Sequence, residues 1–137
     1  HPHPGGPQQQ QTPQMQNLQE VKTNAFIEIL NLSKSQIEDF TELYVAYDSE
    51  MNDAAATYSP AISQLNRVDR STVSYDQVND VIQAQIDLAQ ALIDIKSKYL
   101  KLFSKVLSPS QTLGLFQQEN MIRTKIQDEQ KRRSRQE

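Results

Sequence analysis

The sequence predicts an all-α protein made of four long, thin helices. Apolar residues recur at spacings of three and four along most of the chain, which is the pattern of helices with a buried face. Glycine occurs only three times, and the apolar share of 36% is below the roughly 45–50% of ordinary globular domains. Two near-identical helix-start motifs divide the pattern. These three observations favour elongated helices over a thick layered core.

The two motifs are Leu-Ser-Lys-Ser-Gln at 32–36 and Leu-Ser-Pro-Ser-Gln at 107–111. The first serine of each is a suitable N-cap, because its hydroxyl can accept from a free N–H of the first turn. The glutamine three residues later can accept from the N–H of that serine, which completes a capping box. Pro109 fits the first helical position, where its missing N–H costs nothing. The duplication predicts a repeated helix–turn–helix plan.

Composition excludes several classes of protein. The 137 residues suit a single domain, and the absence of cysteine excludes disulfides, thiolate metal sites and cysteine catalysis. No stretch approaches the ~20 apolar residues that cross a bilayer, so we expect no membrane insertion. The chain does not begin with methionine, so a targeting segment can already have been removed.

Charge is divided between the two ends of the chain. Residues 1–95 hold four Lys or Arg against thirteen Asp or Glu, whereas residues 96–137 hold ten against four. The acidic front and the basic back can attract each other within one molecule or between two copies. The simpler interpretation, a pair of solvated faces, stays open.

The chain begins with a polar segment. Residues 1–17 are rich in Pro, Gly and Gln, and Met15 is their only large apolar residue, so we expect a disordered tail. His1 and His3 are the only histidines; a weak metal site there is the alternative to a plain flexible tail. A helix is then expected over about 18–30, as the first element of a helical domain spanning 18–130.

The second helix has the clearest pattern. Its apolar seam contains three tyrosines, for which we expect core packing rather than ligand binding. The seam consists of Ile37, Phe40, Tyr44, Tyr47, Met51, Ala54 and Tyr58. Pro60 is expected to end or kink this helix, or to start a short further turn, before a loop over 66–74.

The third helix is expected over about 74–106. Its apolar positions cover an arc of roughly 200°, about twice the stripe of an ordinary surface helix. It therefore has to contact more than one neighbour, as the central helix of the fold or through an intermolecular face. The fourth helix starts at the second motif, where Gly114 can mark a close helix crossing. Residues 131–137 form a basic C-terminal tail.

No pattern in the sequence supports catalysis. Both histidines lie in the tail, cysteine is missing, and no phosphate-binding glycine loop or metal-ligand spacing occurs. We therefore expect neither an enzyme nor a cofactor. Nucleic-acid binding is not expected, because the acidic remainder of the chain repels phosphate.

The duplicated motif resembles the paired LTxxQ motif of the Spy/CpxP family of periplasmic stress proteins and chaperones, with serine in place of threonine. The segments FTELYVAYDSEM (40–51) and KVLSPSQTLGLFQQE (105–119) are similar to Bacteroidetes-type members. The resemblance covers about residues 18–130. The motif residues, to which we assign helix capping, are Leu32, Ser33, Gln36, Leu107, Ser108 and Gln111.

This resemblance implies a four-helix, hairpin-like protomer that pairs into a curved, cradle-shaped antiparallel homodimer. It implies a periplasmic, ATP-independent chaperone that binds unfolded or aggregation-prone proteins under envelope stress. The alternative is an envelope-stress or sigma-factor-linked sensor or adaptor that binds a periplasmic signalling protein. Relatives that sense metals use ligands missing from this ordered region.

Client binding is expected where basic charge and apolar residues meet. Long-range charge would speed capture, and scattered apolar contact would hold the client loosely. The residues chosen on this basis are Phe26, Leu30, Lys96, Lys101, Lys105, Phe116, Arg123 and Lys125.

Overall fold

The computed structural model describes residues 13–136, which contain helices and no strand. The prediction of an all-α fold with four long helices is confirmed for this part of the chain. The elements are α1 (Pro13–Ile29), α2 (Lys34–Ser63), the 3-10 helix η1 (Gln64–Arg67), α3 (Tyr75–Phe103) and α4 (Pro109–Gln136).

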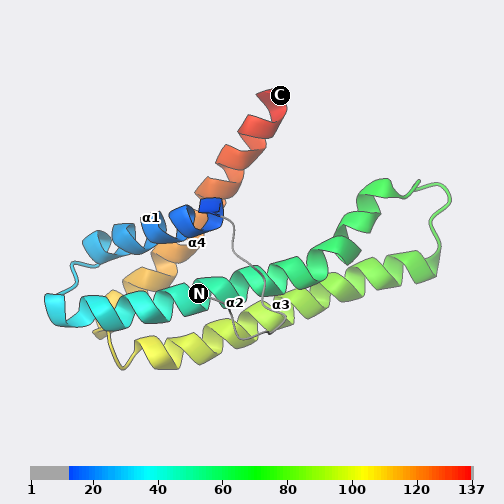
Figure 1. Ribbon diagram of the computed structural model, residues 1–137. Helices are drawn as coiled ribbons and strands as arrows, with labels where there is room; N and C mark the ends of the chain where they lie inside the picture. The colour runs from blue at the N-terminus through cyan, green and yellow to red at the C-terminus, as the bar shows by residue number, and fades with distance from the viewer. Residues whose placement is uncertain (1–12, 137) are drawn as a thin grey trace, which may run out of the picture.

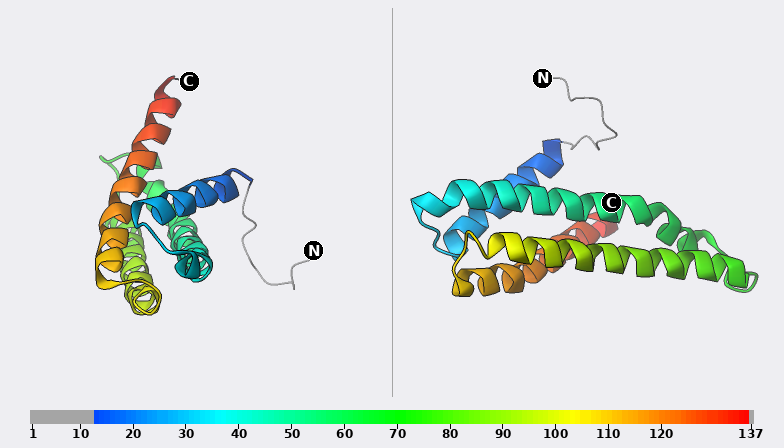
Figure 2. Two further views of the ribbon diagram at one scale, coloured as in Figure 1. Left: turned by 90° about the vertical axis from the view of Figure 1, so that its left-hand side faces the viewer. Right: turned by 90° about the horizontal axis from the view of Figure 1, so that it is seen from below.

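The helices form a four-helix head that continues into a two-helix arm (Figure 1). Helices α2 and α3 lie side by side and antiparallel along the whole length of the molecule. Helices α1 and α4 pack against one end of this pair only, and the right view of Figure 2 shows the other end without them. We call residues 13–52 and 95–122 the head, and residues 53–94 the arm.

Several helix boundaries differ from those expected. Helix α1 begins at Pro13, inside the segment expected to be a tail, and Pro13 is suited to a first turn because proline needs no N–H partner there. Helix α4 runs to Gln136 and so includes most of the expected basic tail at 131–137. Helix α3 ends at Phe103, three residues early. Residues 1–12 and 137, with His1 and His3, lie outside the described residues.

Pro60 lies inside α2, which continues to Ser63. The proline ring removes one i→i−4 hydrogen bond and crowds the preceding turn, which bends a helix. The last turns of α2 accordingly bend away from the axis of the rest of the helix in Figure 1. Of the alternatives that the sequence left open, the structure has the kink.

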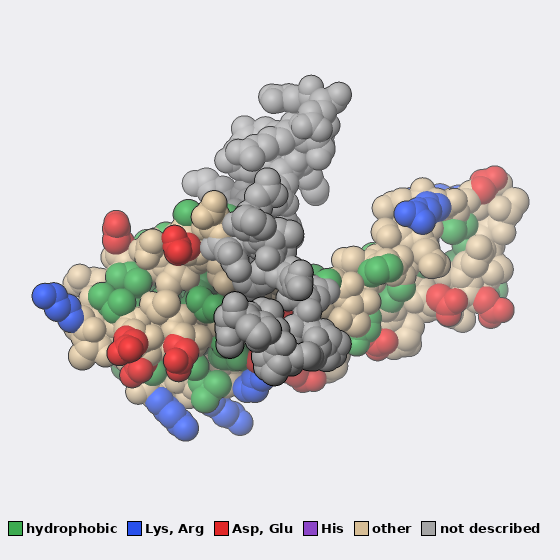
Figure 3. Space-filling model, viewed as in Figure 1, with side chains coloured by type: hydrophobic (Ala, Val, Ile, Leu, Met, Phe, Trp, Pro, Cys, Tyr) green, Lys and Arg blue, Asp and Glu red, His purple; other side chains and the backbone are tan. Residues whose placement is uncertain are grey.

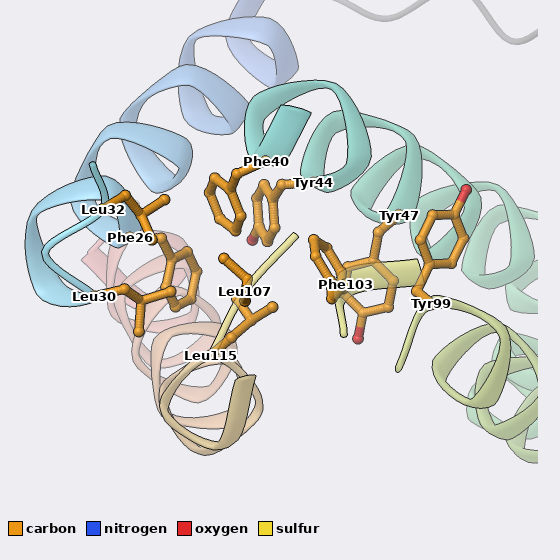
Figure 4. Packing of buried hydrophobic residues seen from close by; sticks show 10 residues of the cluster. All are labelled: Phe26, Leu30, Leu32, Phe40, Tyr44, Tyr47, Tyr99, Phe103, Leu107 and Leu115. Carbon is orange, nitrogen blue, oxygen red and sulfur yellow. The ribbon is translucent and has the colours of Figure 1, made fainter. Parts of the chain in front are cut away.

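The hydrophobic core lies in the head and is largely aromatic (Figure 4). Phe26 of α1 packs against Tyr44 of α2 with ring centroids 5.3 Å apart, and Tyr47 packs against Tyr99 of α3 at 5.4 Å. Such pairs stabilise a core by ~0.5–1.5 kcal/mol beyond the area they bury. Tyr44 and Tyr47 of the seam are therefore core, whereas Tyr58 is half-buried and lies outside the cluster. The fully formed cluster comprises Phe26, Leu30, Leu32, Phe40, Tyr44, Tyr47, Tyr99, Phe103, Leu107 and Leu115.

The two sequence motifs meet at one end of the head and bind each other. Gln36 Nε2 donates to Gln111 Oε1 at 2.7 Å and to the carbonyl oxygen of Val106 at 3.1 Å. Gln111 Nε2 donates to the carbonyl oxygen of Leu30 at 3.3 Å. Each amide oxygen also accepts from the N–H of its own serine, Ser33 or Ser108, at 3.0 Å. Each glutamine thus caps its own helix and joins the other motif.

The hydroxyls of the two motif serines do different things. The Ser108 hydroxyl accepts from the N–H of Gln111 at 3.1 Å, as a capping box requires. The Ser33 hydroxyl makes no cap hydrogen bond, although the residue has the capping-box arrangement; it lies 3.0 Å from the Ser35 hydroxyl instead. A third capping box, which the sequence analysis did not identify, starts α3. There the Ser74 hydroxyl accepts from the N–H of Gln77 at 3.1 Å.

The turn between α1 and α2 explains how the motifs come together. Asn31 has a φ of 53°, the left-handed conformation that asparagine tolerates at a helix end. The N–H of Leu32 donates to the carbonyl of Ile27, and that of Asn31 to the carbonyl of Glu28, which is the Schellman pattern. Across this turn α4 approaches closely, since a Cβ added at Gly114 would lie 3.1 Å from Leu30 Cδ2. The predicted close crossing is therefore present.

A buried ion pair joins α1 to α2. Lys22 Nζ lies 2.6 Å from Asp48 Oδ1, and both side chains are almost fully buried. Gln19 Nε2 donates to Asp48 Oδ2 at 3.1 Å and to the Ser49 hydroxyl at 3.2 Å. The middle of α1 is thus held by polar contacts, whereas Phe26 and Leu30 hold its C-terminal end by apolar packing.

We predict that Ser108→Ala lowers the free energy of unfolding by about 1 kcal/mol, because it removes a cap hydrogen bond. Ser33→Ala should cost less, since the Ser33 hydroxyl makes no cap hydrogen bond. Urea unfolding followed by circular dichroism measures both. Equal losses in the two variants would contradict the difference between the two caps.

We predict that Lys22→Met costs about 3–5 kcal/mol of stability, because it leaves the buried Asp48 carboxylate without its ammonium partner. The double variant Lys22→Met with Asp48→Leu should be more stable than Lys22→Met alone, since it removes both charges. Urea unfolding of the single and double variants tests this. A double variant no more stable than the single one would show that the ion pair is not the source of the loss.

Candidate functional site

The most regular exposed feature of the described surface is a row of apolar side chains on α3. Ile82, Ile86, Ile93 and Leu100 are 43%, 54%, 60% and 46% exposed. Their spacings of four and seven place them on one side of the helix, and Tyr75, 86% exposed, lies seven residues before Ile82. We call these five residues the α3 stripe.

The α3 stripe lies away from the face that packs on α2. That inner face contains Val81, Ala84, Tyr99 and Phe103, all buried. At 100° per residue, the centres of the two faces are about 120° apart around the helix. The wide apolar arc predicted from the sequence is therefore divided in two: one part covers α2, and the other is open to solvent in this protomer.

The polar neighbours of the α3 stripe change sign along the helix. Asp87 and Asp94 directly follow Ile86 and Ile93, and each accepts a hydrogen bond at 2.9 Å from the glutamine four residues earlier. Lys96 and Lys101 flank the end of the stripe at Leu100, and both are exposed. A segment lying along the stripe would thus meet apolar contacts throughout and basic charge at the head.

Apolar atoms elsewhere are scattered. On the face shown in Figure 3 they form small separate areas among polar and charged atoms. Val21, Ile29, Val45, Leu113 and Met121 are exposed singly on the other helices. Single exposed apolar side chains are normal and indicate no site by themselves.

The side chains predicted to bind clients fall into three groups. Lys96 and Lys101 near the C-terminal end of α3, and Lys105 in the turn after it, are exposed. Phe26 and Leu30 are buried, so assigning them to a client surface is wrong for the described chain. Phe26 of α1 packs on Tyr44 of α2, and Leu30, in the turn after α1, lies against α4 at Gly114. Phe116 is half-buried, with its ring edge-on to Tyr47 and Phe103, and belongs to the core rim.

Arg123 and Lys125 form the third group. Both lie on the α4 backbone, but their side chains are outside the described residues.

Sequence reasoning did not include four exposed apolar residues of α3 among the candidate client-binding residues: Ile82, Ile86, Ile93 and Leu100. The signal that could have found them was their seven-residue spacing within the wide arc of the third helix.

A small polar cluster fixes α3 against α2 where the head meets the arm. Glu50 accepts from Tyr99 Oη at 2.5 Å and from Lys98 Nζ at 2.8 Å. Burial alone would raise the pKa of Glu50, but the hydrogen bonds from Lys98 and Tyr99 outweigh it and hold that pKa below its ordinary value. Burial, together with the Glu50 carboxylate, raises the pKa of Tyr99 to about 12.

The described residues hold no group of three or more His, Cys, Asp or Glu side chains placed to bind a metal ion. Within the same part of the chain, every helix is too short or too polar to span a bilayer.

Comparison of the chain with protein-family models, with curated proteins and with solved structures found no match. The class that the fold defines is an all-helical protein with an aromatic four-helix head and a two-helix arm. Its candidate site is an open helical surface.

We predict that Tyr99→Phe removes a tyrosine that titrates at about 12 in a spectrophotometric alkaline titration. In the wild type, the raised pKa means that folding favours the protonated phenol, so this contribution to stability is lost as the pH rises toward 12. Tyr75→Phe, at an exposed position, is the matched control and should leave the late titration in place. A late component that persists in Tyr99→Phe would contradict the assignment.

Proposed function

We propose that this protein is an ATP-independent chaperone that binds unfolded or aggregation-prone proteins along the α3 stripe. The observation that carries the proposal is a regular exposed apolar row along one long helix, set among charges. The motif resemblance to periplasmic stress proteins supports the same function and a periplasmic location.

The proposed mechanism is loose, distributed binding. Burying the remaining exposed part of one isoleucine contributes about 1 kcal/mol, so a client touching a few stripe residues is held weakly and exchanges readily. Lys96 and Lys101 attract acidic or partly unfolded chains from a distance and speed their capture. An open helix face imposes no shape on the client, which suits many different unfolded sequences.

A second candidate function is an adaptor for one signalling protein. The observation that favours it is the seven-residue spacing of the stripe, because a partner helix packs against such a seam. A single saturable partner recovered at one-to-one stoichiometry would favour the adaptor. Many substoichiometric clients would favour the chaperone.

We predict that Ile86→Ser with Ile93→Ser reduces protection of a denatured test protein from aggregation several-fold, because it removes two of the five apolar residues of the α3 stripe. Light scattering at a few-fold excess of chaperone measures the effect. Val21→Ser with Leu113→Ser is the matched control, since these residues are 63% and 61% exposed on other helices and should leave protection unchanged. No protection by the wild-type protein would end the proposal.

A further inference from the structure

Helix α1 crosses α2 obliquely instead of running beside it. Both views in Figure 2 show its N-terminal end passing beyond α2, away from α3. Contacts join residues 19–26 of α1 to residues 44–49 of α2, and the turn at 30–33 connects α1 to the rest of the head. Because α2 and α3 pack on each other along their whole length, α1 can lift away while that pair stays together.

The buried face of α1 is rich in polar side chains. Gln19, Lys22 and Thr23 are all buried, whereas Val21 and Ile29 are exposed. The Thr23 hydroxyl donates to the carbonyl oxygen of Gln19 at 2.7 Å, so this hydrogen bond lies within α1 and does not hold it to α2. Apolar burial is the main favourable contribution to packing, so α1 is seated less firmly than a helix that buries its aliphatic residues.

The ion pair between α1 and α2 does not prevent α1 from leaving. Lys22 Nζ lies 2.6 Å from Asp48 Oδ1 and 6.0 Å from the centroid of the Tyr44 ring. When α1 lifts away, both charges return to water together, and their hydration offsets much of the attraction that is lost. For this ion pair, displacing the whole helix therefore costs less than removing one charge and leaving the other buried.

The surface beneath α1 combines apolar and acidic groups from two helices. We call it the α1 seat, and it consists of Tyr44, Asp48 and Ser49 of α2 and Gly114 of α4. The side chains that fill it are Lys22, Phe26 and Leu30, which follow one another at spacings of four residues along one row. Figure 4 shows Phe26 and Leu30 lying within the aromatic core cluster.

Each part of the α1 seat accepts a different kind of side chain. The Asp48 carboxylate accepts a cation, and the Tyr44 ring packs against an aromatic ring. Gly114 leaves room for an aliphatic side chain, because a Cβ there would lie 3.1 Å from the methyl group that now occupies the space. The seat therefore recognises a helix that presents a cation, an aromatic ring and an aliphatic group in that order.

We propose that the α1 seat is a second binding site, for an amphipathic helix of another protein, and that α1 occupies it until such a helix displaces α1. The ligand carries Lys or Arg, an aromatic residue and an aliphatic residue at successive spacings of four. It has an apolar residue where α1 has Thr23. This inference goes beyond the proposed function, which needs only the α3 stripe.

A helix of another protein fits this role better than α1 of a second copy. The attachment of α1 to its own head gives it an effective concentration on the order of millimolar at the seat. The α1 of a second copy makes the same contacts without this advantage, so it does not displace the resident helix. A foreign helix gains affinity where it replaces the buried Gln19 or Thr23 with an apolar residue.

The test uses a fluorescein-labelled peptide of residues 17–32 as the probe and the full chain as the receptor, with binding followed by fluorescence anisotropy. Phe26→Ala with Leu30→Ala in the chain loosens its own α1. This chain should bind the peptide at least roughly tenfold more tightly than the wild type, because the open seat is more populated. Lys22→Ala in the chain is a milder second variant and should shift binding in the same direction. Circular dichroism verifies that each variant is folded.

A charge reversal shows whether the peptide occupies the α1 seat. A chain with Asp48→Lys should prefer the Lys22→Glu peptide to the unchanged peptide by more than roughly tenfold, because like charges otherwise face each other. The chain with Phe26→Ala and Leu30→Ala should have the opposite preference.

Changes within the peptide test the ligand class. Thr23→Val should tighten binding to the loosened chain several-fold, because it removes a buried hydroxyl. Phe26→Ser should abolish binding, since the Tyr44 ring then loses its aromatic partner. Val21→Ser is the matched control: Val21 is exposed on the other side of α1, so binding should be unchanged.

Absence of saturable binding to the loosened chain would overturn the inference. Equal binding by the loosened and wild-type chains, or binding indifferent to the charge reversal, would do the same. A wild-type dimer that Phe26→Ala with Leu30→Ala converts to a monomer would assign the seat to a second copy and also overturn it. The variant with Ile86→Ser and Ile93→Ser should bind the peptide as the wild type does, so failure at the α1 seat is distinguishable from failure of the α3 stripe.

Discussion

The hydrogen bonds between Gln36 and Gln111 are the constraint on which the head depends. Each amide caps its own helix through its oxygen and reaches the other motif through its nitrogen. The two chain reversals are thereby fixed to one another at a single point. Leu32 and Leu107, the first residues of the two motifs, belong to the core cluster, so apolar packing and the amide hydrogen bonds hold the same end of the head together.

The fold was largely accessible from the sequence, because its signals are local. Periodic apolar residues and the serine–glutamine spacing place four helices, and Gly114 marks a close crossing that the structure contains. The pairing of Gln36 with Gln111 could not be predicted from the sequence, because a capping glutamine has the same sequence signature whether or not its amide nitrogen donates to a distant residue. From the sequence, Pro60 was compatible with a helix end, a kink or the start of a new turn. In the structure the helix continues past Pro60 with a kink.

The candidate site was harder to predict, for a physical reason. Phe26 and Ile93 both occupy apolar positions at helical spacing, yet one is fully buried and the other is 60% exposed. Helical periodicity shows that a residue shares a face with others, but only the arrangement of neighbouring helices determines whether that face is covered. The basic residues Lys96 and Lys101 were found because charge on a polar helix face stays in solvent.

The head and the arm differ in local stability. The head has a multi-ring core, whereas the arm consists of α2, α3 and the short η1, and Val81 and Ala84 are the buried residues among its described side chains. Local opening costs least where few apolar contacts are lost. Backbone amides of the arm should therefore exchange with solvent deuterium through partial openings that leave the head folded. The tip of the molecule, around the kink at Pro60, would then act as the adaptable part of an otherwise rigid frame.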